Sequence, residues 1–139
     1  RIPIGTPLRF ALDYAGLADN ASRVFLGGPM MGRPIASLDV PILKGCSGVL
    51  VFTEEETARL KEYPCISCGR CLEACPYFLN PSRLARLSKA RMYAEMKDYH
   101  VFDCVECGCC TFACPSHIPI VQLIRTGKDD LTHRKEPDA

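Results

Sequence analysis

Two stretches of closely spaced cysteines limit what this 139-residue chain can fold into. CISCGRCLEACP at residues 65–76 and CVECGCCTFACP at 104–115 share their cysteines, one glycine and a final Ala-Cys-Pro at an offset of 39 residues. Both follow the spacing C-x2-C-x2-C-x3-C-P. Nine of the ten cysteines lie between residues 65 and 114. Cysteines three positions apart on a tight loop converge on one point, which favours metal ligation over disulfides and indicates a reducing compartment.

The spacing also predicts which sulfurs act together. In bacterial-type ferredoxins such a run supplies three thiolates to one [4Fe–4S] cluster, and its last cysteine ligates the other cluster. The ligands expected for the first cluster are Cys65, Cys68, Cys71 and Cys114. Those expected for the second cluster are Cys104, Cys107, Cys110 and Cys75. The alternative is a pair of structural zinc sites, but these usually combine C-x2-C pairs from two separate hairpins.

Three further residues near this pattern receive weaker interpretations. Cys109 aligns with Arg70 of the first repeat, so we expect a bystander near the cluster; a swapped ligand or a redox-active thiol are the alternatives. Cys46 precedes an apolar run, and a buried structural cysteine is the favoured interpretation. His117 is expected to be a loop residue, with tuning of the cluster potential through a hydrogen bond as the alternative.

Hydrophobic patterns predict an α/β unit before the cysteines and helices around them. A helix is expected over residues 8–15, ending at Gly16, and strands over 24–26 and 49–52. Thr53 and the three glutamates after it form a capping box, which predicts a helix to about Glu62. Asn80-Pro81 marks another helix start, and a helix from Pro119 is expected to end at Gly127. The predicted domains are residues 1–52, 53–127 and a polar tail, 128–139.

Charge and hydropathy exclude several classes of function. A net charge of +1 gives no overall reason to expect nucleic-acid binding. No run of 18 apolar residues occurs, so no transmembrane segment or signal peptide is predicted. The basic segment 80–100 is either a docking face for an acidic electron carrier or a solvated helix face. Its cations are Arg83, Arg86, Lys89, Arg91 and Lys97.

The residues contain no pattern for hydride transfer or hydrolysis: there is no G-x-G-x-x-G loop, P-loop or catalytic triad in a credible context. Two clusters held by exchanged ligands lie close together, which suits stepwise one-electron transfer. The expected function is therefore an electron relay, in which the protein sets potential, spacing and docking.

Several segments resemble one family over nearly the whole chain. PIGTPL at 3–8, FLGGPMMG at 25–32, DVPILKGCSGVLVF at 39–52 and DCVECGCCTFACPSHIPIVQLIR at 103–125 are similar to the RnfC family, whose members belong to the Rnf complex, a membrane-bound ferredoxin:NAD oxidoreductase that pumps ions. The resemblance implies an α+β fold, with a small SLBB-like β-grasp domain followed by an α-helical ferredoxin domain with two [4Fe–4S] clusters.

The resemblance also implies an assembly. Members of the family carry an upstream domain for FMN and NADH that nothing here matches, so we expect a C-terminal fragment that does not oxidise NADH alone. It would be a peripheral oxidoreductase subunit at the inner, cytoplasmic face of the membrane, with other subunits and ferredoxin as candidate partners. The alternatives are a corrin reductase of propanediol-utilising microcompartments, an iron–sulfur subunit of another reductase, and a docking module with purely structural clusters.

Overall fold

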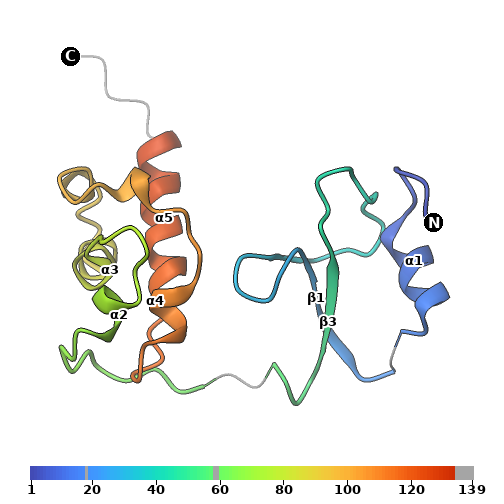
Figure 1. Ribbon diagram of the computed structural model, residues 1–139, viewed down its shortest axis with the longest axis horizontal. Helices are drawn as coiled ribbons and strands as arrows, with labels where there is room; N and C mark the ends of the chain where they lie inside the picture. The colour runs from blue at the N-terminus through green and yellow to red at the C-terminus, as the bar shows by residue number, and fades with distance from the viewer. Residues whose placement is uncertain (18, 58–59, 134–139) are drawn as a thin grey trace. The chain divides into compact units, whose positions relative to one another are not determined.

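The computed structural model describes residues 1–17, 19–57 and 60–133. The chain divides into two units, Arg1–Arg59 and Leu60–Ala139, which are called the N-terminal unit and the helical unit below (Figure 1). Each unit has a hydrophobic core of its own. The division lies a few residues beyond the boundary near residue 53 that the sequence predicts, and residues 58 and 59 beside it are outside the described part.

The N-terminal unit combines one helix with a three-stranded antiparallel sheet. Helix α1 spans Leu8–Ala15, and the sheet has the order β2-β1-β3, from β1 (Ala21–Leu26), β2 (Arg33–Ile35) and β3 (Val49–Thr53). Val24 of the central strand pairs with Ile35 and Val51 and is buried together with Leu8 and Leu12 of α1. The predicted helix and both predicted strands are confirmed, because their apolar periods match the faces that are buried.

The helix predicted to run from Thr53 to Glu62 is wrong. The capping box itself forms, since the Thr53 backbone N–H and Oγ1 donate to Glu56 Oε2 at 2.8 and 3.0 Å. Only a turn over residues 54–57 follows, and residues 60–62 are not helical. Glu54, Glu55, Glu56 and Leu60 are exposed, so the described residues of this segment bury no apolar face, and a short helix without such packing is not stable in water.

The helical unit wraps short helices and two cysteine-bearing loops around one core. Its helices are α2 (Arg70–Glu73), α3 (Pro81–Lys89), η1 (Ala94–Met96), η2 (Val101–Asp103), α4 (Cys109–Phe112) and α5 (Ile120–His133). Helix α3 packs against α5, as Figure 1 shows. Asn80 caps α3 as predicted, because its side chain accepts the Arg83 N–H at 3.0 Å. The largest side chains of the core are Leu84, Met96, Val101 and Ile124.

Helix α5 does not end at Gly127 but continues to His133. A glycine after an apolar period is a common stop signal, which is why the sequence predicted an end here. Gly127 is instead a packing residue: a Cβ at this position would lie 2.5 Å from Met96 Sδ. Met96 is fully buried, so its side chain has little room to move away. Residues 128–133 of the predicted tail are therefore helical, and 134–139 lie outside the described residues.

Candidate functional site

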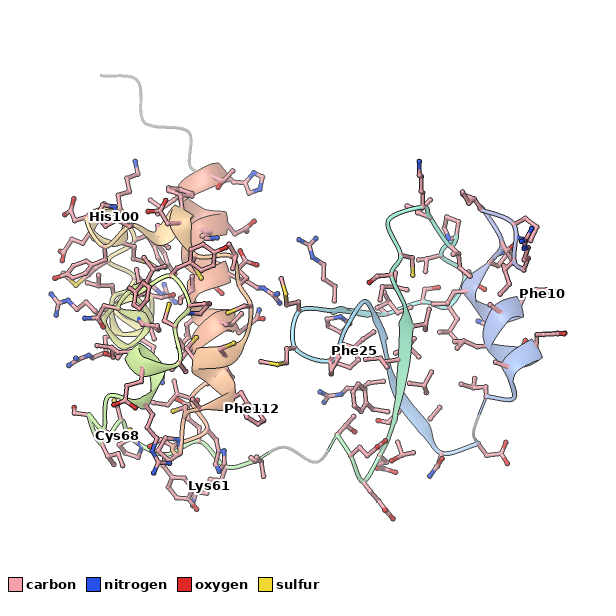
Figure 2. The ribbon with its side chains drawn as sticks, in the orientation of Figure 1. Phe10, Phe25, Lys61, Cys68, His100 and Phe112 are labelled. Atoms are coloured by element: carbon pink, nitrogen blue, oxygen red, sulfur yellow. The ribbon has the colours of Figure 1, made fainter. Side chains whose placement is uncertain are left out.

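The four cysteines predicted for the first cluster line one cavity of about 660 Å³ in the helical unit. Three belong to the first repeat and the fourth follows α4 in the second: Cys65, Cys68, Cys71 and Cys114. Cys65 and Cys68 are exposed, whereas Cys71 and Cys114 are half-buried. Figure 2 labels Cys68 on the loop before α2. A group bound in this cavity would therefore be nearest to solvent on the side of Cys65 and Cys68.

The four cysteines predicted for the second cluster line a separate pocket with mostly apolar walls. They are Cys75, Cys104, Cys107 and Cys110. Leu84, Val121 and Ile124 contribute to the walls, and the free volume between the side chains is about 20 Å³. The donor set again suits a thiolate-bound cluster, but these side chains would have to move apart to admit one. Both pockets thus combine three cysteines of one repeat with the last cysteine of the other.

Hydrogen bonds between the repeats bring Cys114 beside the first loop. The buried Ser116, two residues after Cys114, donates from Oγ to the Pro64 carbonyl at 2.9 Å. The Tyr63 N–H donates to the Ser116 carbonyl at 3.0 Å. These bonds hold the end of the second repeat against the residue that precedes Cys65. The three residues between Cys110 and Cys114 therefore bring the sulfur of Cys114 to the loop of the first repeat.

The two ligand loops have the same backbone geometry. Ser67 and Glu106 occupy equivalent positions and are both left-handed, with φ of 56° and 58°. Gly69 and Gly108 follow two residues later with φ of 79° and 87°. A non-glycine residue in this conformation costs about 1 kcal/mol or more, and such strain clusters at functional sites. The repeated strain indicates that each loop is curled to direct its three cysteines to one side.

Burial raises the pKa of several of these thiols. Desolvation raises the pKa of Cys71 and of Cys104, and it raises the pKa of Cys110 to about 12. Iron binds the thiolate, so cluster assembly has to release the protons of these thiols. No three His, Cys, Asp or Glu side chains in the described ranges are arranged to hold a single metal ion. The thiols surround two volumes instead of meeting at single points.

The ligand loop of the second repeat is held by a half-buried ion-pair network. Glu106 accepts Arg125 Nε at Oε2 (2.8 Å) and Lys128 Nζ at Oε1 (3.1 Å). Lys128 Nζ also donates to the Cys104 carbonyl at 2.5 Å. Burial of Glu106 opposes its ionisation, but the hydrogen bonds and the positive charges of Arg125 and Lys128 together outweigh burial and lower its pKa. Helix α5 thereby fixes the loop that carries Cys104 and Cys107.

This ion-pair network was not expected from the sequence, although a signal for it is present there. The offset of 39 residues that relates the cysteines also relates Arg86 to Arg125 and Lys89 to Lys128. The internal repeat therefore extends from the loops into α3 and α5, and each helix carries an Arg and a Lys at the same positions. Arg86 and Lys89 line the first cavity, where Lys89 pairs with Glu62.

The remaining candidates are not among the eight cysteines that line the pockets. Cys109, at the start of α4, lines neither pocket and is hydrogen-bonded to Cys107, which raises its pKa. Cys46 is half-buried, not fully buried, and its Sγ donates to the Gly48 carbonyl at 3.4 Å. His117 is an exposed loop residue with a left-handed backbone. In the basic segment, Arg83 is half-buried and packs over the Tyr99 ring, whereas the other four cations are exposed: Arg86, Lys89, Arg91 and Lys97.

The helical unit is a 4Fe–4S dicluster domain. A family with this description, "4Fe-4S dicluster domain", matches residues 62–118, which contain both cysteine repeats. Over the region that it spans, the chain is similar to the C subunits of ion-translocating oxidoreductase complexes, the RnfC subunits. The expected family resemblance is thus confirmed.

The relatives that show this are much longer than the chain. The C subunit of the proton-translocating ferredoxin:NAD(+) oxidoreductase complex of Clostridium ljungdahlii is 48% identical over 93% of this chain, which covers 29% of that protein. The C subunits of the ion-translocating oxidoreductase complexes of Rhodobacter capsulatus and Yersinia enterocolitica are 43% and 45% identical over 97% and 92% of the chain. The chain covers 26% and 19% of these two proteins. Across the described residues no helix is long and apolar enough to span a bilayer.

Proposed function

We propose that this chain is an electron relay that carries single electrons through two [4Fe–4S] clusters in an ion-translocating oxidoreductase complex. The observation that carries the proposal is the pair of four-cysteine pockets in the helical unit. Iron–sulfur clusters are held by four thiolates, and cluster potential depends on net charge, hydrogen bonds to sulfur and solvent exposure. The clusters supply the redox chemistry, while the residues of the chain hold them and exclude water.

The proposed ligands follow the lining of the two pockets. The first cluster is assigned to Cys65, Cys68, Cys71 and Cys114. The second cluster is assigned to Cys75, Cys104, Cys107 and Cys110. In this assignment the fourth ligand of each cluster comes from the other repeat. The hydrogen bonds of Ser116, which join the two repeats beside the first pocket, support this for Cys114.

The relatives suggest the assembly in which the relay works. The name of the Clostridium ljungdahlii relative includes proton translocation, ferredoxin and NAD(+), so we infer that this chain is part of an oxidoreductase subunit with other subunits and ferredoxin as partners. We place it peripherally at the inner face of the membrane. FMN and NAD(H) would bind in a domain outside this chain. The N-terminal unit, with its helix and antiparallel sheet, is assigned as an SLBB-like β-grasp domain.

Two other functions are less well supported. The names of the relatives favour the ion-translocating complex over a corrin reductase. A purely structural role for the clusters differs from a relay in one measurable respect, because a relay exchanges electrons with a protein carrier. That difference defines the experiment.

In this experiment, the anaerobically reconstituted chain is mixed with reduced low-potential ferredoxin in a stopped-flow spectrometer. A relay is expected to bleach in the visible range as its clusters are reduced, and to recover when an oxidised acceptor is added. A matched control is the Cys68→Ser/Cys107→Ser chain, which removes one proposed ligand from each cluster and should give no response. Intact clusters that ferredoxin leaves oxidised would contradict the relay and support a structural role.

A further inference from the structure

The two ligand loops differ in charge although they share one backbone geometry. In the second repeat, the residue between the first two cysteines that has the left-handed backbone is Glu106, which binds Arg125 and Lys128. In the first repeat the equivalent residue is the uncharged Ser67. The cations equivalent to Arg125 and Lys128 are present on α3, but Lys89 pairs with Glu62, which precedes the loop. The same helix positions thus meet different partners in the two halves.

The ion pairs at the two loops also differ in burial, which determines how strongly solvent screens their charges. The side chains of Lys128 and Glu106 are 17% and 25% exposed, whereas those of Lys89 and Glu62 are 49% and 41% exposed. Solvent and salt screen exposed charges strongly and half-buried charges much less. Lys128, Arg125 and Glu106 together carry one net positive charge beside the ligand residue Cys104. At the first loop, Arg86, Lys89 and Glu62 carry the same net charge, but all three are exposed to solvent.

A hydrogen bond to sulfur acts in the same direction. The Glu106 N–H lies 3.4 Å from Cys104 Sγ, toward which it donates. The left-handed backbone of Glu106 aims this N–H, and the bonds from Arg125 and Lys128 hold the residue in place. Glu106 is therefore a positioning residue for the second ligand loop.

These contacts have a predictable electrostatic consequence. A cluster bound by four thiolates is negatively charged, and its reduction adds one more negative charge. A neighbouring cation and an N–H donor to sulfur stabilise the reduced form more than the oxidised form, which raises the potential. The carboxylate of Glu106 acts in the opposite sense, but two cations outweigh it.

We infer that Lys128 of α5, together with Arg125 and the Glu106 loop, raises the potential of the second cluster through its charge beside Cys104. This inference rests on the proposed function.

The test is an EPR-monitored redox titration of the 139-residue chain with both clusters reconstituted. Lys128→Gln is expected to lower one of the two midpoints, that of the second cluster, by about tenfold in the ratio of reduced to oxidised cluster, which is about 59 mV for one electron. The midpoint of the first cluster should stay in place. Lys128→Arg keeps the charge and should restore most of the wild-type value.

Two further variants complete the experiment. Lys89→Gln makes the same change at the equivalent position of the first repeat, where Lys89 lines the first cavity, so it should leave in place the midpoint that Lys128→Gln lowers. Glu106→Gln removes the opposing negative charge and should raise the midpoint that Lys128→Gln lowers. This second variant tests the inference even if Lys128→Gln does not fold.

The outcomes separate this inference from the function on which it rests. If Lys128→Gln leaves both midpoints unchanged, or if Lys89→Gln shifts the same midpoint by an equal amount, the inference is overturned and the relay is left intact. Unchanged or lowered potentials in Glu106→Gln also overturn it. A wild-type chain that assembles no iron–sulfur cluster overturns the relay and the inference together.

Discussion

Replacement of Cys114 by serine is expected to remove the first cluster and spare the second, although Cys114 belongs to the second repeat. Cys114 lines the same cavity as Cys65, Cys68 and Cys71, and Ser116 ties its segment to Pro64. Conversely, Cys75→Ser should remove the second cluster. Each variant is expected to fall from about eight irons per chain to about four, because one missing thiolate exposes a whole cluster to loss.

Spectra of four variants identify which cluster has been lost. Cys68 and Cys107 are each among the first three cysteines of a repeat, so their assignment is the same whether or not the fourth cysteine binds the other repeat's cluster. Cys68→Ser and Cys107→Ser therefore serve as reference variants. The EPR spectrum of reduced Cys114→Ser should match that of Cys68→Ser, and the spectrum of Cys75→Ser should match that of Cys107→Ser. Cys109→Ser is the control, because Cys109 lines neither pocket. If Cys114→Ser instead resembles Cys107→Ser, each repeat binds its own cluster and the crossed assignment is wrong.

The second large effect concerns folding of the helical unit without its clusters. The ligand segments before α2 and α4 have little regular structure, and the buried core contains ten residues. Metal binding to a site that is absent from the unfolded chain contributes its free energy to folding, on the order of 10 kcal/mol for small metal domains. Removal of iron is therefore expected to unfold or loosen the helical unit.

Hydrogen exchange measured by mass spectrometry checks this expectation. Amides of α3 and α5 should lose more than about a hundredfold of their protection when the clusters are removed anaerobically with a chelator. The N-terminal unit is an internal control, since the core around Leu8 and Val24 contains no proposed ligand. Its strands β1 and β3 should exchange equally slowly before and after. Equal protection of α3 and α5 in the iron-free chain would contradict a stabilising role for the clusters.

The sequence predicted those parts of the molecule in which a local signal agrees with burial. Helix α1 ends at Gly16 because the left-handed backbone there, with φ of 83°, suits glycine. Strands β1 and β3 follow from apolar runs that pair in the sheet. The grouping of cysteines into two pockets could be expected because the spacing limits how far each loop can reach. The bonding of these cysteines to clusters remains a prediction.

Other parts depend on contacts that no local pattern encodes. The segment after Thr53 has the side chains of a helix start, yet its described residues bury no apolar face. Gly127 stands inside α5 because Met96, thirty-one residues earlier, occupies the space of a Cβ. The repeat of Arg86 and Lys89 at Arg125 and Lys128 is visible in the sequence, but only the structure distinguishes an exposed pair from a half-buried one. Which carboxylate each of these cations pairs with depends on the tertiary structure.

An anaerobic count of iron and sulfide on the reconstituted chain, followed by an EPR-monitored redox titration of the same sample, tests the central claim most directly. The relay predicts about eight irons and eight sulfides per chain and two reducible, magnetically interacting centres. Zinc in place of iron, about four irons, or clusters that no physiological donor reduces would contradict it.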